Sequence, residues 1–359
     1  MRTGYSVKRI KDICDKGSSN VAQKDLEKRN GNYPIFGASG LIKNVDFYHQ
    51  DKDYVGIVKD GSGIGRVSFY PAQSSLIGTL QYIFPKTGYD IRYVGYCLQS
   101  LNLSSYRQGA AIPHIYFRDY GEREVLVVEG IKEQQRIVDI LDQEFAKIDV
   151  LKANAEKSLQ ASKDLFQATL KKELEPKEGW IMYRLPDISD NLDSKRVPIT
   201  KSVRDNGCYP YYGASGIVDY VADYIFDEPL LLVSEDGANL LARSTPIAFS
   251  IEGKTWVNNH AHVLRFGDRR KQKFVEYWIA SHNISSYITG TAQPKLTQKA
   301  LNSITFHIPA NENALNSILA NLDDMSTNCE CLQENYQKTL TLCDDLKQSL
   351  LRKAFNGEL

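Results

Sequence analysis

The stretch of sequence that decides the fold runs from Ile131 to Leu174 and reads IKEQQRIVDILDQEFAKIDVLKANAEKSLQASKDLFQATLKKEL. Apolar side chains recur along it in steps of three and four residues, which places them on one stripe of an α-helix. Neither Gly nor Pro interrupts the stretch, and Pro176 ends it. The expected stripe consists of Ile137, Leu141, Phe145, Ile148, Leu151, Ala155, Leu159, Phe166, Leu170 and Leu174.

A second stretch with the same periodicity covers the last part of the sequence. A stripe this narrow is unstable when it faces water, so each helix needs a partner. We therefore expect the two helices to pair with each other as an antiparallel coiled coil. The second stripe consists of Leu315, Ile318, Leu322, Met325, Cys329, Leu332, Tyr336, Cys343, Leu346 and Leu350.

The segments that precede the two helices repeat each other. Residues 33–40 read YPIFGASG, and residues 209–216 read YPYYGASG, 176 positions further on. Residues 109–113 read GAAIP and recur as GTAQP at 290–294, with an offset of 181. Because these offsets stay ordered and nearly constant, one unit of a globular domain and a helix occurs twice. Two such units joined by an antiparallel helix pair would be related by an internal pseudo-twofold axis.

Each globular segment is predicted to be rich in β-structure, because short β-branched or aromatic runs lie between Gly and Pro residues. Tyr33-Pro34 and Gly37–Gly40 are predicted as turns. The fold class expected is α+β, with domains at 1–129 and 179–310 and helical segments at 130–178 and 311–359. The predicted strands are 54–58, 66–70, 80–84, 229–233, 246–250 and 260–264, and the predicted shorter helices are 92–101 and 273–281.

Composition restricts the class of protein only broadly. A chain of 359 residues is long enough for two or more domains. Lys plus Arg and Asp plus Glu both total 44, but the first globular segment is net positive and the last helical segment net negative. No signal-like or membrane-spanning apolar run is visible, so we expect a cytoplasmic protein. Cys329 and Cys343 lie on the apolar stripe and are expected to be small buried hydrophobes.

Catalytic motifs are not found in the sequence. Gly61–Gly65 lacks the helix start of a dinucleotide fingerprint and is better interpreted as a flexible hairpin. The run NGCYPY at 206–211 resembles the Asn/Asp-Pro-Pro-Tyr motif of amino-methyltransferases but lacks its first Pro. His260 and His262 alternate in a predicted strand, so their rings should point to opposite faces, one packed and one in solvent, which argues against a shared metal.

What remains is a set of polar and basic side chains in the loops of the two repeats. Arg, Lys, Asn and Gln suit base edges and phosphates because they offer charged or bidentate donors. Any one of them alone is an ordinary surface residue, but they differ between otherwise matched scaffolds, as expected if two different short DNA sequences are read. The candidate DNA-contacting residues are Lys59, Ser62, Arg66, Thr79, Gln81, Arg107, His114, Asn239, Arg243, Asn258, Asn259, His260 and Lys295.

Several stretches, taken together and in order, resemble the specificity subunit of type I restriction-modification systems. The first repeat departs from the pattern, because SLIGT at 75–79 stands where the second repeat has WVNNH at 256–260. Base-contacting residues therefore cannot be transferred from one repeat to the other. The stretches that carry the resemblance are Tyr209–Gly216, Leu231–Gly237, Trp256–Ala261, Gly109–Ile115 and Leu350–Leu359.

The resemblance implies two target-recognition domains that alternate with two helical spacers. It implies a non-catalytic subunit that binds a bipartite site in double-stranded DNA, with the paired helices setting the gap. It also implies two modification subunits as partners, which methylate adenine at N6 with S-adenosylmethionine, and restriction subunits that can join them. No cofactor in this chain and no membrane contact are implied. Two alternatives remain open: the DNA-targeting subunit of a fused restriction-methylation enzyme, and a coiled-coil scaffold whose domains bind proteins or sugars.

Overall fold

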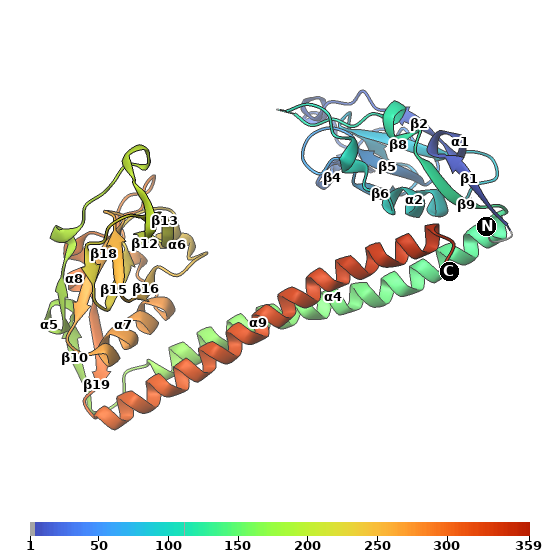
Figure 1. Ribbon diagram of the computed structural model, residues 1–359. Coiled ribbons are helices and arrows are strands. Elements are labelled where there is room, and N and C mark those ends of the chain that lie inside the picture. Colours follow the sequence, from blue (N-terminus) through green and yellow to red (C-terminus); the bar gives the residue numbers. More distant parts are fainter. Residues whose placement is uncertain (1–3, 111) are drawn as a thin grey trace. The chain divides into compact units, whose positions relative to one another are not determined.

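The computed structural model describes residues 4–110 and 112–359. The chain divides into two compact units, one of residues 1–156 with 337–359 and the other of residues 157–336. In sequence order the β-rich part of the first unit (Figure 1) contains β1 (Tyr5–Arg9), α1 (Ile10–Ile13), β2 (Cys14–Ser18), β3 (Tyr33–Gly37), β4 (Gly40–Val45), β5 (Tyr54–Val58), β6 (Val67–Tyr70), β7 (Ser75–Leu76), β8 (Leu80–Pro85), α2 (Ile91–Gln99), α3 (Phe117–Tyr120) and β9 (Glu124–Val128).

With β14 (Phe226–Asp227) and α6 (Asn239–Ala242) as additions, the second unit contains the same series of elements in its β-rich part. They are β10 (Trp180–Arg184), α5 (Leu185–Ile188), β11 (Ser189–Asn191), β12 (Asn206–Gly213), β13 (Gly216–Val221), β14 (Phe226–Asp227), β15 (Leu230–Ser234), α6 (Asn239–Ala242), β16 (Ala248–Ile251), β17 (Lys254–Val257), β18 (Ala261–Phe266), α7 (Arg269–Ser281), α8 (Gln298–Ser303) and β19 (Thr305–Pro309). The two long helices, α4 (Ile131–Glu173) and α9 (Glu312–Phe355), follow the two β-rich parts.

The two β-rich parts share one sheet topology. The antiparallel sheet β2-β8-β5-β6 of the first unit corresponds to β11-β18-β15-β16 of the second. A smaller sheet with one parallel pairing, β4-β3-β7, corresponds to the sheet that contains β13-β12-β17. Every residue of the central strands β5 and β15 is buried, as their continuous apolar sequences predict. The predicted repeat and the predicted strand at 54–58 are therefore confirmed.

A two-stranded sheet ties the beginning of each β-rich part to its end. Strand β1 pairs antiparallel with β9, and β10 pairs antiparallel with β19. Each pairing returns the chain to the start of its domain just before the long helix begins. These strands were not predicted from the sequence, because the strands of each pair lie more than a hundred residues apart.

The prediction of a turn at Tyr33-Pro34 is wrong, whereas the turn between Gly37 and Gly40 is confirmed. Tyr33 and Pro34 lie inside β3 and pair with residues of β4. Proline is tolerated there because β7 pairs with β3 only at Ile35 and Phe36, so Pro34 has a paired strand on one side alone.

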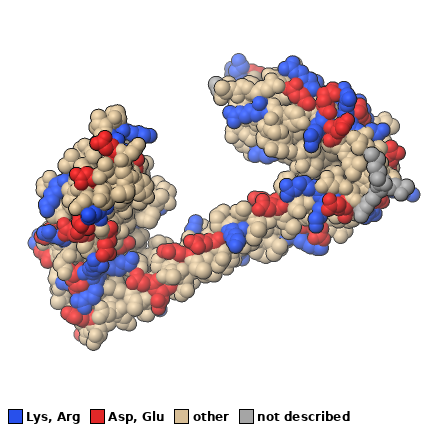
Figure 2. Space-filling model, in the orientation of Figure 1, with Lys and Arg blue, Asp and Glu red and all other residues tan. Residues whose placement is uncertain are grey.

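Helices α4 and α9 pair antiparallel in each unit, as predicted. In the first unit Lys152 Nζ lies 2.8 Å from Asp344 Oδ1, and Lys347 forms an ion pair with Asp149. As the residue number rises along α4, the number of the residue it pairs with on α9 falls, so the two helices are antiparallel. In the second unit Ser162 Oγ donates to the carbonyl oxygen of Cys329 at 3.4 Å. On the face shown in Figure 2, acidic and basic side chains are interspersed along these helices.

The buried seam departs from the expected stripe at three leucines. Leu151, Leu332 and Leu346 are 55%, 42% and 48% exposed, so their assignment to the seam is wrong. Successive seam residues are three or four positions apart, 3.5 on average. At each of the three leucines the observed spacing is four residues, whereas a spacing of three was expected. The half-buried seam positions are therefore the following residues, Lys152, Gln333 and Lys347. Cys329 and Cys343 are buried, as predicted.

Each β-rich part packs on the long helices of its own unit through an equivalent contact. In the first unit the hydroxyl of Tyr96 on α2 donates to Asp142 on α4, and burial of this tyrosine raises its pKa to about 12. In the second unit Tyr277 on α7 donates to Asp323 on α9. Both pairs are related by the offset of 181, so the repeat includes the junction between domain and helices. No helix in the described part of the chain is long and apolar enough to cross a membrane.

Candidate nucleic-acid interface

The same loop framework is built at one edge of each β-rich part. In the first unit Lys59 N donates to Thr79 O at 3.0 Å, Gly61 N to Pro113 O at 2.9 Å, and Ile115 N to Lys59 O at 2.9 Å. These bonds join the loop after β5, the start of β8 and the turn that ends at His114. They bring together residues that are 20 to 56 positions apart in the sequence.

The second unit repeats these three bonds at equivalent residues. Glu235 N donates to His260 O at 2.9 Å, Gly237 N to Pro294 O at 3.0 Å, and Leu296 N to Glu235 O at 2.8 Å. The frameworks are thus equal in backbone, whereas three equivalent side chains differ. Lys59, Thr79 and His114 of the first unit correspond to Glu235, His260 and Lys295 of the second.

In the first unit Asp60 organises the polar side chains of this framework. His114 Nδ1 donates to Asp60 Oδ1 at 2.7 Å, and the ammonium group of Lys59 pairs with the same carboxylate. Because a carboxylate only accepts, it fixes the ring so that Nε2 is the nitrogen left for a ligand. Ser62 and Arg107 are exposed and Thr79 is half-buried on neighbouring loops.

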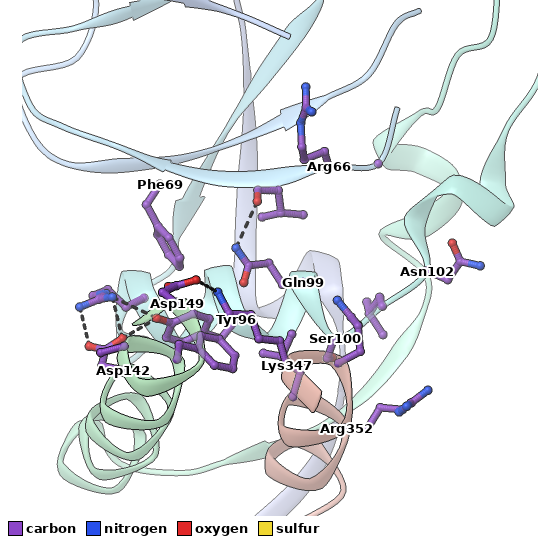
Figure 3. A pocket seen from close by; sticks show the side chains of 18 residues that line it. Arg66, Phe69, Tyr96, Gln99, Ser100, Asn102, Asp142, Asp149, Lys347 and Arg352 are labelled. Carbon is purple, nitrogen blue, oxygen red and sulfur yellow. Dashed lines mark hydrogen bonds and ion pairs between the residues drawn. The ribbon is translucent and has the colours of Figure 1, made fainter. Parts of the chain in front are cut away.

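Arg66 belongs to the same edge, and it also lies at the rim of a groove within the first unit. Its guanidinium donates to the carbonyl oxygen of Ala38, in the hairpin turn between β3 and β4. The groove has a volume of about 960 Å³ and is lined by the β-rich part and by α4 and α9 (Figure 3). Phe69, Gln99, Asn102 and Arg352 are among its lining side chains.

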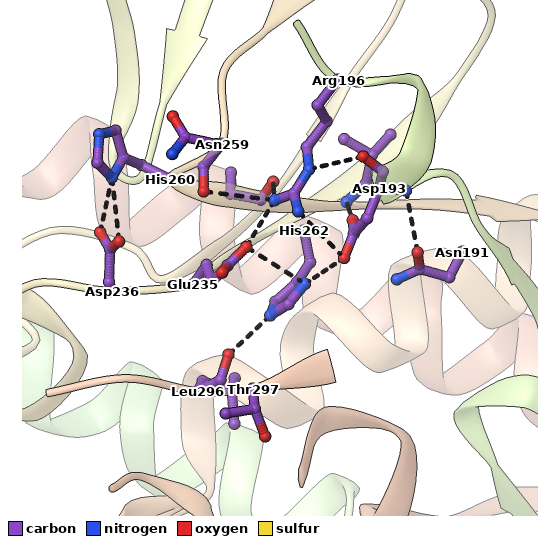
Figure 4. Close-up of polar contacts among 12 residues, drawn as sticks. Asn191, Asp193, Arg196, Glu235, Asp236, Asn259, His260, His262, Leu296 and Thr297 are labelled. Carbon is purple, nitrogen blue, oxygen red and sulfur yellow. Dashed lines mark hydrogen bonds and ion pairs between the residues drawn. The ribbon is translucent and has the colours of Figure 1, made fainter. Parts of the chain in front are cut away.

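In the second unit Asp236 takes the place of Asp60, but the histidine it holds comes from another loop. His260 Nδ1 donates to Asp236 Oδ1 at 2.9 Å, and half of the His260 side chain is exposed (Figure 4). Lys295 Nζ lies 3.1 Å from Glu235 Oε1, and Asn259 is exposed beside His260. An imidazole held by a carboxylate is therefore present at both edges, supplied by the turn in one and by the start of β18 in the other.

A buried ionic network lies beside the pair of His260 and Asp236 in the second unit (Figure 4). Arg196 Nη1 donates to Glu235 Oε2 at 2.6 Å, and His262 Nδ1 donates to Asp193 Oδ2 at 2.6 Å. His262 Nε2 donates to the carbonyl oxygen of Leu296 at 2.7 Å. Burial would raise the pKa of Asp193, but the hydrogen bond from His262, with other donors, outweighs it and lowers the pKa. Asp193, Glu235 and His262 lie close enough to hold a metal ion, yet Arg196 already supplies a positive charge there.

We expect Asp193→Asn to destabilise the second unit by about 3 kcal/mol at pH 7, because it removes the carboxylate that His262 contacts at 2.6 Å in a buried site and leaves Arg196 with the single carboxylate of Glu235. The folded pKa of Asp193 is lowered, so its contribution is present above the unfolded value near pH 4 and is lost as the pH falls through the folded value. Urea unfolding at pH 7 and at pH 3 should show a smaller acid-induced loss of stability in the variant than in the wild type.

The matched control for this prediction is Asp190→Asn. Asp190 pairs with Arg265 at 2.8 Å, but the Asp190 side chain is 67% exposed. Its replacement should change stability by less than about 0.5 kcal/mol. Equal effects of the two substitutions would contradict the assignment of a supporting role to the buried network.

Four of the residues predicted to contact DNA have side chains that form hydrogen bonds within the protein. Gln81 is 4% exposed and its amide donates to the hydroxyl of Tyr120, while Asn258 is 7% exposed and accepts from the His260 amide. Arg243 Nη1 donates to Ile279 O at 3.0 Å, and the pKa of Arg243 is lowered by burial. Asn239 holds its own loop by bonds to Ser244 and Thr245. The expectation that these side chains point outward is corrected, because each is used in packing or in loop closure.

The structure brings the other nine predicted residues to the two edges. Lys59, Ser62, Arg66, Thr79, Arg107 and His114 belong to the first, and Asn259, His260 and Lys295 to the second. The prediction that one histidine of the pair His260 and His262 is packed while the other faces solvent is confirmed, because the His262 side chain is 1% exposed and that of His260 is 50% exposed. Asp60, Asp236 and Arg196 were not predicted to organise these edges, although Asp-Gly recurs at 60–61 and 236–237. Ala111, in the predicted turn at 109–113, lies outside the described residues.

Comparison with known proteins identifies relatives of both repeats. The family model of the type I restriction modification DNA specificity domain matches residues 3–161 and 177–339. A putative type I restriction enzyme specificity subunit, S.HindORF215P of Haemophilus influenzae, is 32% identical over 125 residues, which are 35% of this chain and 32% of that protein. The chain thus matches about a third of the length of this curated relative.

Two solved structures show a similar fold. One is described as the structural basis underlying complex assembly and conformational transition of the type I R-M system, with a TM-score of 0.74 at 14% identity over 100% of this chain and 99% of that one. The other, the HsdS subunit from Thermoanaerobacter tengcongensis, gives a TM-score of 0.54 at 13% identity over 100% and 98%. At these identities the likeness concerns the fold alone.

Proposed function

Because the chain belongs to the type I restriction modification DNA specificity family, we propose that it is a specificity subunit that reads a bipartite site in double-stranded DNA. Each β-rich domain reads one half-site with the loop edge described above. The domains are proposed to span 1–129 and 179–310, with helical spacers at 130–178 and 311–359. The helices set the gap between the half-sites.

The observation that carries this proposal is the doubled loop framework with different side chains on it. The backbone bonds of the two edges are equivalent, but Lys59, Thr79 and His114 are replaced by Glu235, His260 and Lys295. A protein that holds one target twice would keep the side chains as well as the backbone. Charged and amide groups on an invariant framework suit two different base sequences.

The chemistry of methyl transfer is assigned to partner subunits rather than to this chain. The two modification subunits would bind S-adenosylmethionine and methylate adenine, and restriction subunits would add cleavage. The polar groups of the two edges supply donors and charges for positioning DNA, and the candidates are Lys59, Ser62, Arg66, Thr79, Arg107, His114, Asn259, His260 and Lys295.

We propose that the exposed leucines beside the helix seam bind the modification subunits. Leu151 and Leu346 are exposed, and each directly precedes a lysine of the seam. The ion pair of Asp149 with Lys347 sets the register of the two helices, and in this register both leucines lie on the same flank of the first unit. Leu165, 53% exposed, and Leu332 occupy the corresponding positions in the second unit. An equivalent apolar flank in each unit suits two copies of one partner.

We expect the double variant Leu151→Asp with Leu332→Asp to fold normally but to lose its modification subunits. Both side chains are exposed, so the melting temperature should change by less than about 3 °C. Burying a leucine in an interface contributes about 2 kcal/mol, so binding should weaken at least about tenfold per site. Co-purification and titration with the methyltransferase subunit measure this loss.

The control for the flank is Ala153→Asp, an exposed residue two positions beyond Leu151 and about 200° around the helix. It adds the same charge to the same turn and should leave partner binding unchanged. If Ala153→Asp weakened binding as much as the leucine variants, the flank would not be the binding surface.

The function itself is tested by filter binding of the full chain to duplex DNA, with and without co-expressed modification subunits. We expect saturable binding that a specific duplex competes for more strongly than a random one. Binding confined to proteins or sugars, with no retention of duplex DNA in either preparation, would favour the scaffold alternative. Replacing Lys59, Arg66 and Arg107 together by Ala should reduce retention and its dependence on salt concentration.

A further inference from the structure

Two short loops, 108–114 and 289–295, stand at the two edges and are closed by the same backbone bonds, and the position of Ile112 and Gln293 is one of the exposed positions at which they differ. In the first unit Gln108 N and His114 O, and His114 N and Gln108 O, are bonded at 2.8 Å. In the second unit the pairs Thr289 N to Lys295 O and Lys295 N to Thr289 O are bonded at 2.9 and 2.7 Å. Each loop is therefore closed by a reciprocal pair of backbone bonds at equivalent positions.

Glycine at the start of each loop makes this closure sterically feasible. Gly109 and Gly290 both have φ of +85°, where side chains are disfavoured. A Cβ at Gly109 would lie 2.6 Å from the carbonyl oxygen of Ile112, and one at Gly290 would lie 2.5 Å from that of Gln293. Equivalent carbonyl oxygens thus lie close to equivalent glycines in the two loops. This contact holds the backbone of residues 112 and 293 in equivalent positions.

The next residue docks each loop on the DNA-binding edge. Pro113 O accepts from Gly61 N, and Pro294 O accepts from Gly237 N, in the loop that also carries the histidine-holding Asp60 or Asp236. Immediately before these prolines, Ile112 is 60% exposed and Gln293 is also exposed. One framework therefore presents an apolar side chain at one edge and an amide at the other.

We propose that Ile112 and Gln293 are specificity-determining residues, each of which reads one base pair of its half-site. Ile112 contacts the 5-methyl group of a thymine, for which an exposed branched apolar side chain is suited. Gln293 bonds the N6 and N7 atoms of an adenine, the pair of groups that a glutamine amide matches. This inference deepens the proposed function and rests on it.

The test begins with selection of bound sequences from random duplexes by the full chain with its co-expressed modification subunits. The selected duplex is then made with single thymines replaced by uracil, which lacks only the methyl group, or single adenines replaced by 7-deazaadenine, which lacks N7. We expect one uracil position, in one half-site, to lower affinity about fourfold, the factor for one buried methyl. One 7-deazaadenine position in the other half-site should lower it about fivefold, the factor for one hydrogen bond.

The variants assign these effects to the two residues. Ile112→Ala should abolish the uracil effect and leave the 7-deazaadenine effect intact, and Gln293→Ala should do the reverse. Since the two loops are closed by the same backbone bonds, Ile112→Gln and Gln293→Ile should each change the preferred base pair at one position of one half-site. Selection that returns the wild-type sequence from all four variants would overturn the inference while leaving the proposed function standing.

A second outcome separates the inference from the function. If the wild-type complex enriches no sequence, the proposed function fails, and the reading by residues 112 and 293 fails with it. If uracil has no effect at any position while Ile112→Ala weakens binding to every duplex equally, Ile112 is a general apolar wedge, and the thymine contact is wrong.

Discussion

Replacing Ile148 by Asp should lower the free energy of unfolding of the first unit by about 4 kcal/mol, because the loss of a buried isoleucine is combined with burial of a charge. Ile148 is 3% exposed in the seam of α4, in the same apolar core as Cys343 and Leu351 of α9. That core continues into the β-rich domain, so the damage should extend beyond the helices. Circular dichroism during urea unfolding measures the change.

Leu151→Asp is the matched control, three residues further along the same helix. Leu151 is 55% exposed, so the added charge stays in water and stability should change by less than about 1 kcal/mol. Equal losses in the two variants would mean that the seam does not follow the 3.5-residue period described here.

Exchanging the second unit for that of another family member should change one half-site completely and leave the other as it was. Each unit has its own apolar core, so recognition by one domain does not depend on the packing of the other. The exchange should cover residues 157–336 rather than 179–310. Leu170 and Leu322 of the long helices and Leu174, just beyond the end of α4, belong to the core of the second domain, and the shorter exchange would cut through it.

Mapping of methylated adenines in cells that carry the chimera with its modification subunits reads out both half-sites at once. The control is the wild-type chain, in which residues 157–336 are its own, expressed with the same modification subunits. Changes in both half-sites, or in neither, would contradict reading of one half-site by each domain.

The repeat and the helices could be predicted from sequence because both are periodic patterns. An offset near 180 residues recurs through the chain, and steps of three and four define a helix face without reference to any partner. The course of the seam could not be predicted to the residue. By spacing alone, Leu151 and Lys152 both fit the helix face. The ion pair of Lys152 with Asp344 on the partner helix shows that Lys152 lies in the seam.

The loops that form the candidate site could be predicted from the sequence, but the direction of each side chain could not. Glycine and polar residues marked the correct loops, because turns need them. Whether an amide or a guanidinium faces solvent depends on distant segments: Gln81 is buried by Tyr120, and Arg243 bonds the end of α7. Arg196 was missed because its partners Glu235 and Ala261 are 39 and 65 residues away. The pair Ile112 and Gln293 becomes visible only when the two loops are known to share a backbone.

The central claim is that this chain selects a bipartite DNA site, with one half-site for each β-rich domain. The most direct measurement is sequencing of methylated adenines in a methylation-free host that expresses the chain together with its modification subunits. We predict a single motif made of two defined half-sites separated by a gap of fixed length and arbitrary sequence, which disappears when this chain is omitted. A continuous motif without a gap, or methylation that is the same with and without the chain, would contradict the claim.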